Sequence, residues 1–96
     1  DSKFSRDGNN LITKLPIKLT DALLGGEYRV PTRDGEEVLT IAGGIAHGEI
    51  VRVRSKGVPH GRGTRGDLLV RIDIEFPKKL SKSTRELIEK LRSEGL

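Results

Sequence analysis

Apolar and polar residues alternate with a period of two along most of the chain, which is the pattern of half-buried β-strands. The clearest case is the segment 67–76, DLLVRIDIEF. One face of this segment carries only apolar side chains, namely Leu68, Val70, Ile72, Ile74 and Phe76. The residues between them are mostly charged. We therefore expect a long strand with one face packed in the core and the other face in water.

Four shorter segments alternate in the same way: 11–19, 27–32, 36–41 and 50–54. Pro16 removes a backbone donor from the first of them, which places that strand at a sheet edge or beside an interrupted ladder. Asp34-Gly35 lies between the second and the third, and this dipeptide favours a tight β-hairpin. The pattern therefore predicts an all-β body built from two packed sheets.

The hydrophobic period changes to that of an α-helix beyond Pro77. The apolar stripe of this segment consists of Leu80, Leu87, Ile88 and Leu91. Ser83 has the capping-box spacing to Glu86, with Ser81 as the rival N-cap, and Gly95 is placed to end the helix. The narrow stripe can pack on the β body or against a second copy of the chain, and the sequence leaves both alternatives open.

A shorter helical turn is expected in TDALLGG, residues 20–26, with Thr20 or Asp21 as its cap and Gly25-Gly26 to end it. The predicted fold is therefore mainly β: a two-sheet β-sandwich with one short helical turn and a C-terminal amphipathic helix. We divide the chain into a β-sandwich over residues 1–79 and a helical segment over residues 80–96.

The composition narrows the class of protein. With 96 residues, the chain has room for one hydrophobic core. It contains no cysteine, which excludes disulfides and zinc-thiolate sites and fits a reducing compartment such as the cytoplasm. We expect no cofactor. Its apolar runs are too short for a membrane span or a signal peptide. It lacks an initiator methionine, which suggests a piece of a longer protein.

A glycine-rich segment, SKGVPHGRGTRGDL, spans residues 55–68. Its Gly61-x-Gly63-x-x-Gly66 pattern matches the dinucleotide-binding fingerprint by letters, but it leads into a strand rather than into a helix, so we reject a nucleotide site. The Arg65-Gly66-Asp67 tripeptide does not indicate adhesion, because Asp67 is followed at once by the strongest strand. We expect Asp67 to accept hydrogen bonds from loop amides, and the glycines to turn the backbone.

Catalysis has little support in the sequence. His47 and His60 are the candidates for a base at neutral pH, and both lie in glycine-bearing loops without a linked nucleophile. Two loop histidines also fall short of the three or four ligands that a metal site needs. We therefore expect no catalytic residues and no metal-binding residues, and we expect that the protein is not an enzyme.

Positive charge is concentrated between residues 50 and 66, where there are five basic residues and no acidic one. These residues are Arg52, Arg54, Lys56, Arg62 and Arg65. They predict, as an alternative function, a basic β-domain that binds nucleic acid. Aromatic stacking platforms are absent from this segment, so we favour a charged surface over a nucleic-acid partner. A β-sandwich with an edge strand can instead bind an extended peptide by strand addition.

Five motifs follow one another along the chain: F-x-R-D-G-N-x-L at 4–11, ALLGG at 22–26, V-P-T-x-D-G at 30–35, R-x-R-x-K-G-V-P at 52–59 and GDLLV at 66–70. In this order they resemble the DnaJ-type J-domain co-chaperones, specifically the second of two C-terminal β-domains and the start of the C-terminal helix. The resemblance runs over nearly the whole chain. One departure is Ser55-Lys56-Gly57, where the family usually has Gly-Lys-Gly.

The resemblance implies a non-enzymatic module that binds unfolded client polypeptides in protein folding and in the heat-shock stress response. It implies a homodimer held by the segment after the β-domain, and we accordingly expect Leu87, Ile88 and Leu91 at the dimer interface. It also implies a DnaK-type chaperone as partner, reached through the family's J domain, whose His-Pro-Asp motif does not occur here. The best-known client groove of the family lies on the first β-domain, so client-binding residues are not assigned.

Overall fold

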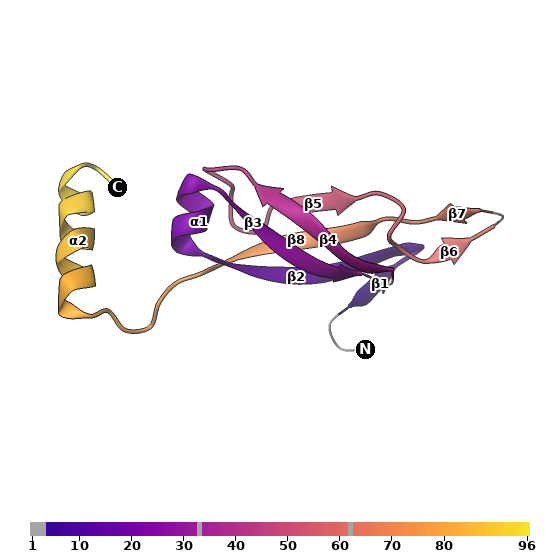
Figure 1. The fold of residues 1–96 in the computed structure, drawn as a ribbon, viewed down its shortest axis with the longest axis horizontal. Coiled ribbons are helices and arrows are strands. Elements are labelled where there is room, and N and C mark those ends of the chain that lie inside the picture. Colours follow the sequence, from indigo (N-terminus) through magenta and orange to yellow (C-terminus); the bar gives the residue numbers. More distant parts are fainter. Residues whose placement is uncertain (1–3, 33, 62) are drawn as a thin grey trace.

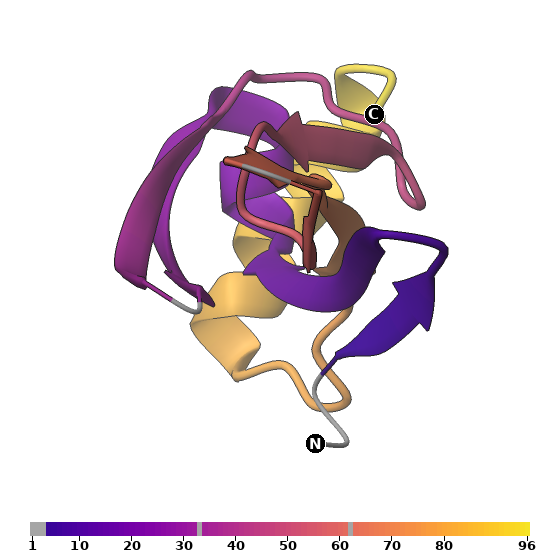
Figure 2. The ribbon, with the colours of Figure 1, turned by 90° about the vertical axis from the view of Figure 1, so that its right-hand side faces the viewer.

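The computed structural model describes residues 4–32, 34–61 and 63–96. The molecule is elongated, 56 × 23 × 20 Å, with the C-terminal helix α2 at one end and a small hairpin at the other (Figure 1). The view along the long axis shows the hairpin β3–β4 beside the larger sheet (Figure 2). The predicted fold, mainly β with two sheets and a C-terminal helix, is confirmed.

The larger sheet has four strands, in the order β1 (Ser5–Asp7), β2 (Asn10–Lys18), β8 (Leu68–Glu75) and β5 (Ile50–Val53). Its two central strands, β2 and β8, run parallel, in a register that joins Leu11 to Leu68 and Lys18 to Glu75. The outer strands β1 and β5 pair antiparallel to them. The centre of the sheet thus joins two segments that lie far apart in the sequence.

The second layer is the antiparallel hairpin of β3 (Gly26–Thr32) and β4 (Gly35–Ile41). The hairpin predicted around Asp34-Gly35 is therefore confirmed. Buried side chains of both layers and of the short helix form one core, which consists of Ile17, Ala22, Val30, Leu39, Ile41, Leu68, Val70 and Ile72. The core explains why the two layers stay together, since each contributes apolar side chains that the other covers.

The predicted alternation of the strand 67–76 holds for most of its length. Leu68, Val70 and Ile72 have no exposed surface, and Ile74 packs partly against the core. Phe76 does not follow the prediction, because its side chain is 69% exposed. The reason is that β8 ends at Glu75, so the packed face ends before Phe76 is reached.

A third strand pair, β6 (Pro59–His60) and β7 (Thr64–Arg65), forms the small hairpin opposite α2 (Figure 1). The sequence pattern predicted only a connection here. Gly61 and Gly63 have φ angles of +61° and +66°, a conformation that glycine adopts without strain. These two glycines therefore turn the backbone, as predicted.

The short helix α1 (Leu19–Leu24) follows Lys18 and has no side-chain cap. The prediction that Thr20 or Asp21 caps it is wrong, because both residues lie inside the helix. Asp21 instead accepts a hydrogen bond of 2.5 Å from the Tyr28 hydroxyl on β3. This contact joins α1 to the second layer. The helix ends at Leu24 with Gly25 as its C-cap, which agrees with the predicted stop at Gly25-Gly26.

The C-terminal helix α2 (Lys82–Ser93) begins after Ser81, whose Oγ accepts the backbone N–H of Thr84 at 3.1 Å. Ser81 is therefore the N-cap, which corrects the assignment of that role to Ser83. Gly95 follows the helix with a φ angle of +99°, as predicted. Over the ranges that the structure describes, no helix is long and apolar enough to cross a membrane.

Candidate functional site

Among the residues that the structure describes, no strand pairs with one side of β2 over the second half of its length; we call this side the open side. β1 covers it only from Asn10 to Ile12, and the pair of Ser5 with Ile12 is the last in the described register. On the opposite side, β8 continues along β2 as far as Lys18. β2 is not an edge strand of the sheet, but Pro16 lies beyond the last described pair with β1, so of the two predicted alternatives the interrupted ladder holds.

Hydrogen bonds at the two ends of β2 show which backbone groups face the open side. The N–H of Leu11 donates to the carbonyl oxygen of Asp67 at 2.9 Å, so the odd-numbered positions face β8. The N–H of Lys18 donates instead to the Tyr28 hydroxyl, also at 2.9 Å, on the other side of the strand. Because backbone direction alternates along a strand, the even-numbered positions face the open side.

Two residues therefore present backbone groups at the open edge. Lys14 presents both its N–H and its C=O, whereas Pro16 presents only its C=O because proline has no N–H. Neither belongs to the described register of β1. The edge thus offers one donor and two acceptors to a further strand.

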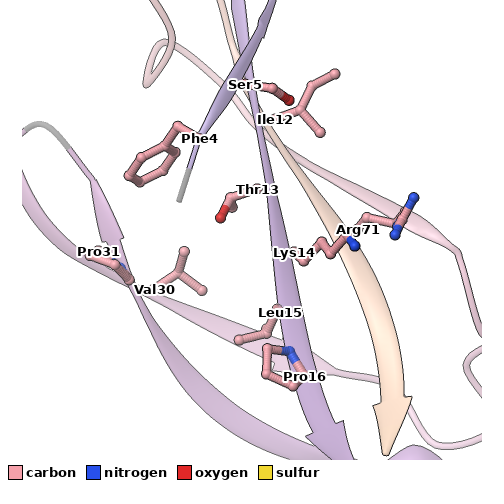
Figure 3. Close-up of a pocket in the computed structure, with 10 residues that line it drawn as sticks. All are labelled: Phe4, Ser5, Ile12, Thr13, Lys14, Leu15, Pro16, Val30, Pro31 and Arg71. Carbon is pink, nitrogen blue, oxygen red and sulfur yellow. The ribbon is translucent and has the colours of Figure 1, made fainter. Parts of the chain in front are cut away.

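A groove of about 610 Å³ runs along this open edge (Figure 3). On the side of β2 that faces β3, its lining includes the apolar side chains of Phe4, Leu15, Val30 and Pro31. On the opposite side of β2 lie Lys14 and Arg71 (Figure 3). A segment placed along the edge meets apolar surface with one face and positive charge with the other. We call this groove, with the open edge, the β2 groove.

A second groove, of about 670 Å³, lies between α1, the connection after β8, and α2. Its apolar lining comes from all three segments: Leu19, Leu23, Phe76, Pro77, Leu80, Leu87, Ile88 and Leu91. The structure therefore brings together Leu87, Ile88 and Leu91, the residues expected at a dimer interface. Their exposed fractions are 61%, 38% and 44%, and no residue of α2 is buried. The β body of the same chain thus leaves the stripe largely uncovered.

Asp34, in the β3–β4 turn, joins that hairpin to the glycine-rich segment. Its carboxylate accepts a hydrogen bond from the Arg65 guanidinium and lies 3.5 Å from the Lys56 ammonium. Lys56 is also 3.4 Å from the carboxylate of Glu37. The hydrogen bond from Arg65, with the positive charges of Arg65 and Lys56, lowers the pKa of Asp34.

Asp67 has a similar role just before β8. Its Oδ1 accepts the backbone N–H of Ser55 at 3.0 Å, and its carboxylate pairs with Arg52. The hydrogen bond from Ser55, followed by that from Arg52, lowers the pKa of Asp67. The prediction that Asp67 accepts a hydrogen bond from a loop amide is confirmed.

These contacts account for most of the basic segment 50–66. Arg52, Lys56 and Arg65 are paired with carboxylates of the same chain. Arg54 is exposed, and Arg62 lies outside the described residues. Internal pairing reduces the charge available for phosphate contacts, and nothing in the arrangement supports the nucleic-acid alternative.

Gly66 is required for close contact between two backbone segments. A Cβ atom at this position would lie 1.8 Å from the carbonyl oxygen of Asn9. The backbone N–H of Gly66 donates to Val58, and its C=O accepts from Gly57, both at 2.9 Å. Turning was the role predicted for these glycines, and close packing is a second role that the pattern did not indicate.

His47 holds the loop before β5 against β8. Its Nδ1 accepts the backbone N–H of Ile74 at 3.0 Å, and its Nε2 lies 3.4 Å from the carboxylate of Asp73. These contacts give His47 a structural role. The side chain of His60 lies outside the described part. Among the side chains that are described, no three His, Cys, Asp or Glu residues cluster as a metal site.

An open strand edge beside an apolar groove is a geometry that polypeptide-binding modules use. Comparison with known proteins agrees with this class, because residues 1–77 match the family model described as the DnaJ C terminal domain. The chain belongs to this family. The resemblance to the DnaJ-type family noted in the sequence is therefore confirmed.

Individual relatives agree with the family. The chain is 49% identical, over 95 residues, to the chaperone protein DnaJ of Rickettsia akari (strain Hartford), of Rickettsia rickettsii (strain Sheila Smith) and of Rickettsia prowazekii (strain Madrid E). In each case the match covers 97% of this chain and 26% of the relative. The chain thus spans about a quarter of the length of these relatives.

Proposed function

We propose that this module holds extended segments of unfolded client polypeptides by adding them as a strand to the open edge of β2. The observation that carries the proposal is the position of Lys14 and Pro16, whose backbone groups face the apolar β2 groove. Main-chain hydrogen bonds to these residues give affinity for any extended chain. Such bonds do not depend on the client sequence, which suits a protein that binds many unfolded chains.

The β2 groove supplies the second part of the affinity. Side chains of an added strand alternate between two faces, so every second client side chain points toward Phe4, Leu15 and Val30. Burial of apolar client side chains there contributes roughly 25 cal/mol for each Å² removed from water. Unfolded proteins expose such side chains, whereas folded proteins bury them.

Paired substitutions in the groove test this site. Phe4→Gln with Pro31→Gln is expected to weaken binding of a fluorescein-labelled apolar nonapeptide about tenfold, as when roughly 50 Å² of apolar contact is lost. Leu24→Gln with Val38→Gln is the matched control, because these side chains are exposed and lie outside the groove. Fluorescence anisotropy measures the affinity, and thermal unfolding checks that each variant is folded. An equal loss of peptide affinity in both variants overturns the proposed site.

Backbone methylation of the peptide tests strand addition itself. An added strand directs every second N–H group toward β2. N-methylation of the peptide at either the odd-numbered or the even-numbered positions should therefore abolish binding, whereas methylation of the other set should be tolerated. An equal loss of affinity for both methylated peptides argues against strand addition. A labelled oligonucleotide provides the counter-test: binding of the oligonucleotide that weakens steeply with salt would favour the nucleic-acid alternative.

We further propose that the segment 80–96 supports homodimerisation, as a unit separate from the β body of residues 1–79. Support comes from the exposed stripe of Leu87, Ile88 and Leu91, which faces an apolar groove large enough to receive side chains of a second copy. The parent protein is proposed to act in the cytoplasm with a DnaK-type chaperone, through a J domain. This last proposal rests on the family alone.

A further inference from the structure

Two positive charges face each other on the outer side of the β2 groove. Lys14 of β2 and Arg71 of β8 are direct register partners across the parallel pair, and both side chains are exposed. Figure 3 shows the two side chains on the same side of β2, away from Val30 and Pro31. Like charges directly opposite each other on a sheet destabilise it. The pair is therefore unfavourable unless negative charge is added.

The described part of the chain does not provide that negative charge. Arg52, Lys56 and Arg65 are each paired with a carboxylate, but no ion pair joins Lys14 or Arg71 to a described acidic residue. The nearest carboxylate along β8 is that of Asp73, two residues beyond Arg71 on the same face, and it lies 3.4 Å from His47 Nε2. The outer side of the groove thus keeps an uncompensated cationic pair.

We propose that the open edge of β2 selects client segments in which an acidic residue lies between two apolar ones. This inference rests on the proposed strand addition at the same edge. A client residue opposite Lys14 has its side chain on the same face as Lys14, so its carboxylate lies beside Lys14 and within reach of the long Arg71 side chain. The two flanking client residues lie opposite Thr13 and Leu15, and their side chains point into the apolar part of the groove.

The length of the selected segment follows from the hydrogen bonds already made. The N–H of Lys18 is occupied by the Tyr28 hydroxyl, and Ser5 occupies the position opposite Ile12. The client strand therefore pairs with the residues between Ile12 and Lys18. Within this stretch Lys14 is the one position whose backbone both donates and accepts at the edge. Its two hydrogen bonds therefore fix the register of the client strand and place the acidic client residue opposite Lys14.

Three labelled nonapeptides test the proposal. They share one apolar sequence and differ only at the central residue, which is Glu, Gln or Lys. The Glu peptide should bind about two- to fivefold more tightly than the Gln peptide, the range for an exposed ion pair, and the Lys peptide should bind most weakly. In Lys14→Gln the preference for Glu over Gln should shrink, and in Lys14→Glu the order should reverse. Arg85→Gln, on α2 and outside the groove, removes the same charge and should leave the order unchanged.

The outcomes separate this inference from the function on which it rests. If all three peptides bind equally, and the Phe4→Gln/Pro31→Gln variant still weakens them, the groove stands and the selectivity for acidic residues is overturned. If none of the peptides binds, strand addition and its selectivity are both overturned. If Arg85→Gln changes the order as Lys14→Gln does, the effect is one of net charge, and the assignment to Lys14 is wrong. Thermal unfolding of each variant checks that the β body is intact.

Discussion

Ser55 donates its backbone N–H to Oδ1 of Asp67 at 3.0 Å, and it does so in a left-handed conformation with a φ angle of +62°. Among the residues that the structure describes, Ser55 is the one non-glycine with a positive φ angle. The hydrogen bond connects the end of β5 to the start of β8, so the strained residue lies at a junction of the larger sheet.

Ser55→Gly is expected to stabilise the chain by up to about 1 kcal/mol. A side chain in the left-handed region costs about 1–2 kcal/mol, and part of the gain is offset by the larger backbone entropy of glycine in the unfolded chain. The measurement is the free energy of unfolding in urea. Ser55→Ala is the control, because it removes the hydroxyl but keeps the strain. Stabilisation by Ser55→Ala as well would show that backbone conformation is not the cause.

The carboxylate of Asp67 is expected to make stability depend on pH in the acid range. Its pKa is lowered in the folded chain from the usual value of 3.8, so its contribution is present above pH 3.8 and is lost as pH falls through the folded pKa. Asp67→Asn should lower the unfolding temperature at pH 7, and its deficit relative to the unmodified chain should shrink toward acid pH. Asp7→Asn gives the same change of charge at an exposed position of β1. A constant deficit of Asp67→Asn at all pH values would contradict the assignment.

Gly66→Ala is expected to destabilise the chain by about 3 kcal/mol, because the added methyl group would overlap the carbonyl of Asn9 and force two backbone segments apart. Gly8→Ala provides the comparison. Gly8 has a positive φ angle, but no atom lies within 4 Å of its Cβ position, so its substitution carries only the conformational cost of about 1–2 kcal/mol. Equal unfolding free energies for the two variants would refute the close-packing role of Gly66.

Leu87→Ser combined with Leu91→Ser is expected to convert a dimer to a monomer, because it removes apolar area from the stripe. Multi-angle light scattering measures the mass, and circular dichroism checks that the β body remains folded. Arg85→Ser combined with Glu89→Ser is the control, since these residues lie on α2 but do not line its groove. A monomeric mass for the unmodified chain at high concentration contradicts dimerisation through this helix. Unfolding of the whole variant would show instead that α2 stabilises its own β body.

Local patterns were sufficient for features that depend on neighbours in the sequence. The period of two identified β8 and its buried face, because Leu68, Val70 and Ile72 must all point into the core whichever strands flank them. Asp34-Gly35 identified the hairpin, and Pro16 indicated an interrupted ladder. The helix caps were less accurate, because Ser81 and Ser83 both satisfy the capping rule and only the conformation of the connection before α2 distinguishes them.

The β2 groove was not predictable from these patterns. Pro16 indicates that β2 has a free side, but not that the side lies next to Val30 and Pro31, or that Arg71 lies beside Lys14. Both relationships depend on the parallel pairing of β2 with β8 and on the packing of β3 across it, which join residues that are not neighbours in the sequence. Alternation specifies which face of a strand is buried and leaves open which strand lies beside it. The local sequence thus determines the strands, the turns and the apolar stripe of α2, whereas the groove and its pair of positive charges arise from long-range packing.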